Sequence, residues 1–231
     1  PKKTIYTTFE FTDIAGLVKG ASKGEGLGNQ FLSNIRLTDA ICHVVRCFED
    51  PDITHVEGSV DPIRDIEIIN LELIMADLQT VENRLAKVER KAQTNKDKDA
   101  MAEVAVLKKI KDALEAEKPA RSVELDKDEL AIVKAFSLLT LKPVIYVANM
   151  SDEDIMDPES NPLYQKVKAF AAAENSHVVP VCAKIEEELS GLDKEEKAEF
   201  LKELGIAESG LDQIIKTAYS ILNLRTFLTA G

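Results

Sequence analysis

Asp13 and Gly16 are the residues whose types and spacing most clearly suggest chemistry. The β-rich run 5–12 leads into Asp13-x-x-Gly16, and five of the ten glycines lie between positions 16 and 28. A carboxylate at a strand end can bind near Mg²⁺, and a glycine lets a backbone N–H approach a phosphate because it carries no side chain. The pattern predicts a loop that senses a terminal phosphate. A surface loop with glycines at its turns is the alternative.

The loop that would cradle the remaining phosphates is absent from the sequence. There is no G-x-x-x-x-G-K-[ST] motif and no Gly-Lys dipeptide. The dinucleotide-binding fingerprint G-x-G-x-x-G is also excluded, because Gly24, Gly26 and Gly28 alternate and lie about a dozen residues beyond the preceding run. The sequence therefore holds a candidate phosphate sensor without a candidate phosphate cradle.

Asn149, Met150 and Asp152 form a second candidate site, directly after the apolar run 143–149. In nucleotide-binding sheets, ligands lie beyond the carboxyl ends of the strands. An asparagine there can join two loops and contact a base, and a carboxylate a few residues later can bind exocyclic groups. Taken alone, Asn-x-x-Asp is also an ordinary turn and helix cap.

Cys182, Ala183 and Lys184 form a third candidate site, at the end of the apolar run 177–183. Their backbone could close a base pocket at the same edge of the sheet. A plain strand end is the alternative. Three such sites at the ends of three strands are more specific together than each is singly.

Four short apolar segments predict buried strands, at residues 5–12, 40–48, 143–149 and 177–183. Each is rich in Val, Ile, Phe or Tyr and is bounded by polar or turn residues. Helical patterns separate them, and two more helices are expected after the fourth strand, over 194–204 and 209–223, the second capped by Ser209. This alternation predicts an α/β fold on a mostly parallel sheet.

A helical hairpin is predicted between the second and third strands. From Leu71 to Ala92 the apolar residues recur three and four positions apart, which is a heptad seam. A polar turn follows at 93–99, and a second helix carries apolar residues from Val104 to Leu114. Because a short turn makes such helices antiparallel neighbours, we expect a hairpin that projects from the sheet domain. Two ordinary helices packed on the sheet are the alternative. Asp126 and Glu129 then predict a capping box for a helix ending near Ser137.

Composition limits the class of protein. The 231 residues carry a net charge of −12, which argues against general affinity for nucleic-acid backbone and thus against sequence-specific DNA binding, although a local basic patch remains compatible. No apolar run reaches the length of a membrane span, so no membrane association is expected. Three cysteines without C-x-x-C spacing favour reduced thiols in a cytoplasmic protein, each as a small core residue.

The order of these elements matches the TRAFAC class of P-loop NTPases. Within it, the stretch from Asp13 to Leu32, followed by Arg36-Leu37-Thr38-Asp39-Ala40, resembles the Obg-related YchF family of ATPases. The resemblance covers essentially the whole chain and includes the helical insertion. It implies a G-domain-like P-loop NTPase core with an inserted α-helical coiled-coil hairpin.

The resemblance implies roles for four residues around the γ-phosphate. Asp13 would bind Mg²⁺, and Gly16 would sense the γ-phosphate. Leu17 stands where Ras-like enzymes carry a water-orienting Gln, and an aliphatic side chain cannot orient water. In this family a loop histidine is implicated in positioning water, and the resemblance implies that His55 is the matching residue. By sequence alone His55 would be a solvated loop histidine.

The resemblance also implies a base pocket. Asn149 and Met150 would contact the base, and the family's Asn-x-x-Glu pattern, in place of the guanine-reading Asn-Lys-x-Asp, favours ATP. Asp152 departs from that pattern, which weakens the expected preference for ATP. The segment 182–184 would close the pocket. The implied ligands are ATP and Mg²⁺, and the implied partner is the ribosome.

The missing phosphate loop suggests that the chain is a fragment. It begins with Pro1, and the family's P-loop should precede it and a C-terminal TGS domain should follow it. We therefore expect the chain alone to be inactive. The expected division is a first G-domain segment at 1–63, the hairpin at 64–122, a second G-domain segment at 123–223 and a linker at 224–231. Alternatives are a non-catalytic module that binds a protein partner through the hairpin, or a GTPase.

Overall fold

The computed structural model describes residues 10–14, 27–50, 52, 58–95 and 97–225, with the side chains of 27–30 and 95 left out. The helices, short 3₁₀ turns (η) and strands follow one another as α1 (Leu27–Arg36), β1 (Ile41–Arg46), α2 (Pro62–Asn95), α3 (Lys98–Glu115), η2 (Ala120–Ser122), α4 (Lys127–Lys134), η3 (Leu139–Leu141), β2 (Val144–Asn149), η4 (Asp154–Met156), η5 (Pro158–Ser160), α5 (Pro162–Ala173), β3 (His177–Val181), α6 (Ala183–Ser190), α7 (Lys194–Glu203) and α8 (Gly210–Ile221).

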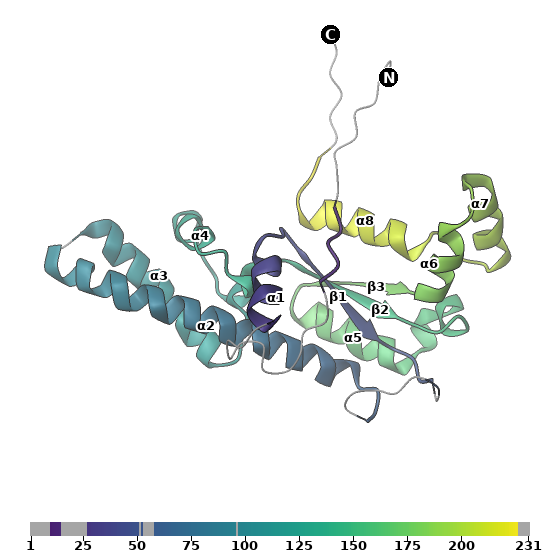
Figure 1. Ribbon diagram of the computed structural model, residues 1–231, viewed down its shortest axis with the longest axis horizontal. Coiled ribbons are helices and arrows are strands. Elements are labelled where there is room, and N and C mark those ends of the chain that lie inside the picture. Colours follow the sequence, from purple (N-terminus) through teal and green to yellow (C-terminus); the bar gives the residue numbers. More distant parts are fainter. Residues whose placement is uncertain (1–9, 15–26, 51, 53–57, 96, 226–231) are drawn as a thin grey trace, which may run out of the picture.

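The three strands form a parallel sheet in the order β1-β2-β3, which confirms the predicted fold class. The register pairs Ile41 with Val144 and, at the other end, Asn149 with both Arg46 and Val181. Helix α5 and the first half of α2 cover one face of the sheet, and α8 covers the other (Figure 1). The central strand β2 is therefore apolar on both faces, as its continuous Val-Ile-Tyr-Val-Ala sequence predicts.

The predicted first strand, 5–12, is not observed in the described residues. Residues 5–9 lie outside the described part of the chain, and residues 10–14 lie in no strand. A strand is stable only when it pairs with a neighbour, and in the described sheet β1 pairs only with β2. Residues 27–29, at the end of the predicted glycine loop, begin helix α1 instead.

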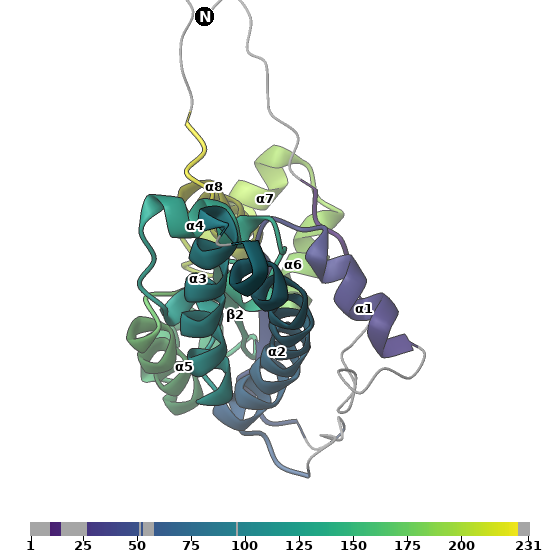
Figure 2. The same cartoon turned by 90° about the vertical axis from the view of Figure 1, so that its left-hand side faces the viewer.

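Helices α2 and α3 form the predicted hairpin, which extends away from the sheet (Figures 1 and 2). The heptad seam is buried at most positions from Ile74 onward, with Leu78 and Ala92 partly buried, whereas Leu71 is 42% exposed. The seam starts late because the first half of α2 packs on the sheet through Ile63 and Ile66. The helix therefore belongs to both the sheet core and the hairpin. The buried residues of the seam are Ile74, Val81, Leu85 and Val88 from α2 and Val106, Leu107, Ile110 and Leu114 from α3.

Helix caps fix the ends of the later helices as the sequence predicts. Asp126 and Glu129 form a reciprocal capping box, although α4 ends at Lys134 rather than near Ser137. Ser209 caps α8 by accepting a hydrogen bond from Asp212 N. Cys47 and Cys182 are buried as predicted, but Cys42 is exposed among the described residues, as is Val44 on the same side of β1.

Asp77 joins the base of the hairpin to η3, the turn that precedes β2. Its side chain is fully buried in α2 and accepts hydrogen bonds from Leu139 N at 2.9 Å and from Thr140 N and Oγ1, both at 2.7 Å. The guanidinium of Arg36, at the end of α1, lies 3.9 Å away. Burial raises the pKa of Asp77, although the hydrogen bonds from Thr140 and Leu139 oppose this. One carboxylate thus connects α1, α2 and η3.

His43 on β1 predicts how the free energy of unfolding changes in acid. Its ring lies 5.7 Å from that of Tyr146, and burial lowers its pKa to about 4, partly opposed by Asp65 and Glu174, while Arg121 lowers it further. The unfolded chain takes up this proton near pH 6.5, whereas the folded chain takes it up only near pH 4. Protonation therefore favours the unfolded chain, and the stability that is present above pH 6.5 is lost as the pH falls toward 4. Relative to His43→Phe, which does not titrate there, the wild-type free energy of unfolding should fall by up to about 3 kcal/mol between pH 7 and pH 4. Urea denaturation at both pH values measures this, and a constant difference would contradict the prediction.

Candidate nucleotide-binding site

The ends of β2 and β3 are joined by two hydrogen bonds. Met150 N donates to Val181 O at 2.8 Å, and Ala183 N donates to Asn149 Oδ1 at 3.1 Å. Parallel neighbours end at the same edge of the sheet, so the two predicted segments meet there. The structure therefore brings together Asn149 and the segment 182–184, as strand-end reasoning predicts.

Asp152 and Lys184 extend this junction to the surface. Lys184 Nζ lies 2.6 Å from Asp152 Oδ2, and the two side chains are 67% and 49% exposed, respectively. The hydrogen bond lowers the pKa of Asp152 and raises that of Lys184, so both groups are charged at neutral pH. The ion pair joins two predicted site residues that the sequence does not pair.

Met150 and Cys182 support the site from beneath. Met150 is 2% exposed and packs in the cluster under β1 and β2, and Cys182 is 4% exposed and packs with Ile185 and Leu189. Neither side chain reaches the surface. Their contribution to a ligand site is therefore made through the backbone and through packing.

Asn161 is a supporting residue that sequence reasoning misses. Its Nδ2 donates to Cys47 O at 3.2 Å and to Asp154 Oδ2 at 3.0 Å, while its Oδ1 caps α5. Asp154 Oδ2 also accepts from Ser151 Oγ at 2.8 Å. The side chain thus joins the loop after β1 to the loop after β2. The Asn-Pro pair at the start of a helix is the available sequence signal, but it predicts only the cap.

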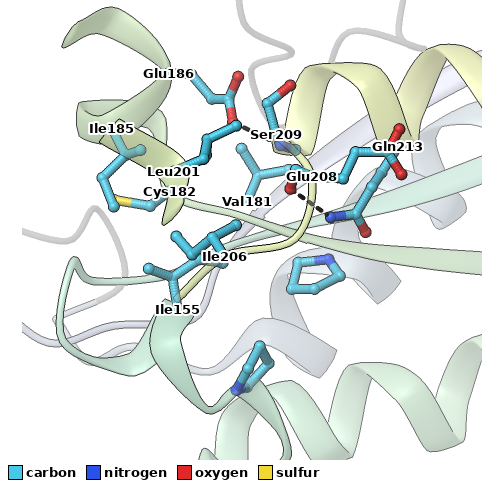
Figure 3. Close-up of a pocket in the computed structure, with 13 residues that line it drawn as sticks. Ile155, Val181, Cys182, Ile185, Glu186, Leu201, Ile206, Glu208, Ser209 and Gln213 are labelled. Atoms are coloured by element: carbon cyan, nitrogen blue, oxygen red, sulfur yellow. Dashed lines mark hydrogen bonds between the residues drawn. The ribbon is translucent and has the colours of Figure 1, made fainter. Parts of the chain in front are cut away.

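A small cavity lies behind this edge, between β3 and the helices α6, α7 and α8 (Figure 3). Its volume is about 70 Å³, and Val181, Ile185 and Leu201 are among its lining residues. Pockets that bind drug-sized ligands measure roughly 300–1,000 Å³, so the cavity is too small for a nucleotide. The candidate site is therefore the exposed edge of the sheet and not this cavity.

Gly210 closes the wall beside the cavity. A Cβ at this position would lie 2.7 Å from Val181 Cγ2, so the start of α8 approaches β3 more closely than any other residue type allows. Gly210 N donates to Glu186 Oε1 at 2.6 Å, which links α8 to α6. These contacts hold α6 and hence the segment 182–184 in place.

The predicted phosphate-sensing residues are only partly described. Asp13 is exposed, and the neighbouring Ile14 packs in a cluster formed by α1, α2 and η3. Gly16, Leu17 and His55 lie outside the described residues. An exposed carboxylate fits Mg²⁺, which prefers oxygen ligands and commonly uses one or two carboxylates plus phosphates. In the described stretches of the chain, no group of three or more His, Cys, Asp or Glu side chains is arranged to hold a metal ion.

Sequence comparisons identify the family. A family model described as "50S ribosome-binding GTPase" matches residues 2–76. The whole chain is 60% identical to the ribosome-binding ATPase YchF of Bacillus subtilis and 52% identical to that of Haemophilus influenzae. The chain belongs to the YchF family. It spans 63% and 62% of the length of these two relatives.

A structural comparison agrees with this assignment. The YchF GTPase of Schizosaccharomyces pombe superimposes with a TM-score of 0.80 at 39% identity, over 94% of this chain and 59% of the other. The YchF-like fold therefore includes the sheet, its covering helices and most of the rest of the chain. The names of these relatives differ in calling the protein an ATPase or a GTPase.

Proposed function

We propose that this protein binds and hydrolyses Mg²⁺-ATP as a conformational switch. The observation that carries the proposal is the junction of Asn149 with Ala183 at the carboxyl edge of a parallel sheet, in a chain 60% identical to a protein named ribosome-binding ATPase. Ligands of such sheets bind beyond this edge. Nucleotide binding would order the glycine-rich loop, and hydrolysis would release it.

In the proposed mechanism, Asp13, Gly16 and His55 act around the γ-phosphate. Asp13 would hold Mg²⁺, which would supply positive charge to neutralise the phosphates. The N–H of Gly16 contacts the γ-phosphate, where a side chain would interfere. Leu17 cannot orient water, so His55 positions the attacking water. Sequence resemblance to the family supports these assignments.

In the same proposal, the base lies against the joined loops. Asn149 contacts it, the segment 182–184 closes the pocket, and Asp152 faces its exocyclic groups. Met150 replaces the lysine of guanine-reading proteins. Its burial supports a packing role rather than direct contact through the side chain. This arrangement favours ATP, with GTP as the competing substrate.

The proposal includes a phosphate cradle contributed by sequence outside the 231 residues. Two observations support this view: the motif is missing from the chain, and the YchF relatives are longer than the chain. We further propose a ribosomal partner and a cytoplasmic location, on the basis of the relatives' names. Among the described helices, none is long and apolar enough to cross a membrane. The 231 residues alone should hydrolyse little ATP.

Mg²⁺-dependent turnover tests the proposal. Protein from the complete reading frame should hydrolyse ATP, and Asp13→Asn should lower turnover at limiting Mg²⁺ by about 100-fold, since loss even of the groups that support a metal ligand commonly costs about 10–100-fold in metal affinity or activity. Titration of turnover with Mg²⁺ measures the change. Asp99→Asn, an exposed change at the start of α3, is the control. No turnover in the unmodified protein, or an unaltered Mg²⁺ requirement in Asp13→Asn, would contradict the proposal.

A further inference from the structure

The ion pair between Lys184 and Asp152 lies where a base would be read, if the proposed nucleotide function is correct. The two residues come from different loops, and both are exposed enough to meet a ligand. Ala183, the neighbour of Lys184, is fixed to Asn149 Oδ1 at 3.1 Å. This contact holds the backbone beside Lys184 close to the loop that carries Asp152. The pair is therefore placed by the fold and not only by the reach of the long lysine side chain.

Asn149 supplies only part of the selection between adenine and guanine. One lone pair of its Oδ1 accepts from Ala183 N–H, which leaves the Nδ2 donor and a second lone pair for a base. A bond from Nδ2 to N7 is common to both purines, because both present N7 as an acceptor. Further selection can come from the groups that face the other edge of the base, where the two purines also differ.

A free Asp152 would favour guanine. An ionised carboxylate only accepts hydrogen bonds, and guanine offers two adjacent donors, N1–H and the N2 amino group. Adenine offers one donor, the N6 amino group, beside the acceptor N1. Two acceptor oxygens facing that edge would leave an acceptor opposed to an acceptor, which a polar site rejects strongly.

We propose that Lys184 determines base specificity. By pairing with Asp152, it makes this position complementary to adenine instead of guanine. The ammonium group has three donors and no acceptor, and one of them is held by Asp152 Oδ2. The pair then presents a carboxylate oxygen beside an ammonium donor. That combination complements the adjacent N6 donor and N1 acceptor of adenine, whereas the two donors of guanine would meet a positive charge.

Competition between ATP and GTP in protein from the complete reading frame tests this inference. Lys184→Ala should raise the affinity for GTP relative to ATP by about tenfold, within the range that a bidentate contact to a base edge provides. In an Asp152→Asn background the same change should alter the ratio by less than about twofold, because no carboxylate remains to be released. Displacement of a fluorescent ATP analogue by each nucleotide measures the ratio.

Lys168→Ala is the matched control. Lys168 of α5 forms a similar exposed pair with Glu159 of η5, at 2.5 Å, and neither residue belongs to the proposed site. Its removal should leave the ratio unchanged, and thermal melting should show that all variants are folded. If both nucleotides bind but Lys184→Ala leaves the ratio as in the unmodified protein, the inference is wrong and the proposed function stands. If the unmodified protein binds neither nucleotide, the proposed function is wrong and the inference fails with it.

Discussion

Asp77→Ala should lower the free energy of unfolding by about 3–5 kcal/mol, the largest stability effect expected of a single polar substitution here. The carboxylate is fully buried and accepts three hydrogen bonds from Leu139 and Thr140. Alanine leaves the backbone N–H groups of both residues buried without a partner, and each such loss costs about 1–3 kcal/mol. Urea denaturation measures the change, which corresponds to a Tm about 10 °C lower for a chain of this size.

Two further variants separate the hydrogen-bond network from charge. Thr140→Val keeps the shape of the side chain but removes the hydroxyl that bonds Asp77 and accepts from Ala120 N at 2.9 Å, so it should cost about 1–3 kcal/mol. Asp112→Ala removes an exposed carboxylate from α3 and should change stability by less than about 0.5 kcal/mol. If Asp77→Ala matched the Asp112 control, the network would not stabilise the fold.

The hairpin could be predicted from sequence because its signal is local. The three–four spacing from Leu71 to Ala92 repeats every turn, and the polar stretch at 93–99 marks the reversal. The position where the seam begins could not be predicted. Ile63 and Ile66 look like a continuation of the same helix pattern, but they pack on the sheet, and only tertiary structure separates the two surfaces.

The three strands of the sheet could be predicted from sequence, but which apolar segments stay outside the sheet could not. Continuous apolar runs identify β1, β2 and β3, and polar residues at their ends identify the edge where Asn149 meets Ala183. The apolar run 5–12 carries an equally clear signal, yet its described residues form no strand. Composition shows the propensity of a segment for β structure, but pairing depends on which strands lie beside it.

The residues that escaped prediction act across long sequence separations. Asp77 reads as one polar residue of an amphipathic helix, but its partners Leu139 and Thr140 lie 62 and 63 residues away. The pair of Lys184 and Asp152 is likewise separated by 32 residues. No local pattern encodes such contacts. They become visible only when the sheet places the loops side by side.

His55→Ala should lower kcat for ATP hydrolysis by about 100-fold, at the low end of what a positioned acid–base or water-orienting side chain contributes. The reason is the aliphatic Leu17, which leaves no polar side chain at the position that orients water in Ras-like proteins. Because His55 is proposed to act on water and not on the nucleotide, the affinity for ATP should stay within about threefold. Single-turnover hydrolysis and equilibrium binding, with protein from the complete reading frame, measure the two quantities separately.

His177→Ala is the matched control, since His177 is exposed at the start of β3 and belongs to no proposed site. It should hydrolyse ATP at the unmodified rate. His55→Gln should recover part of the activity, because a glutamine can orient water without taking its proton. Rescue by Gln would therefore assign His55 to positioning water, whereas no rescue together with a lost rate would assign it to proton transfer. An unchanged kcat in His55→Ala would remove His55 from the mechanism and require another polar group to compensate for Leu17.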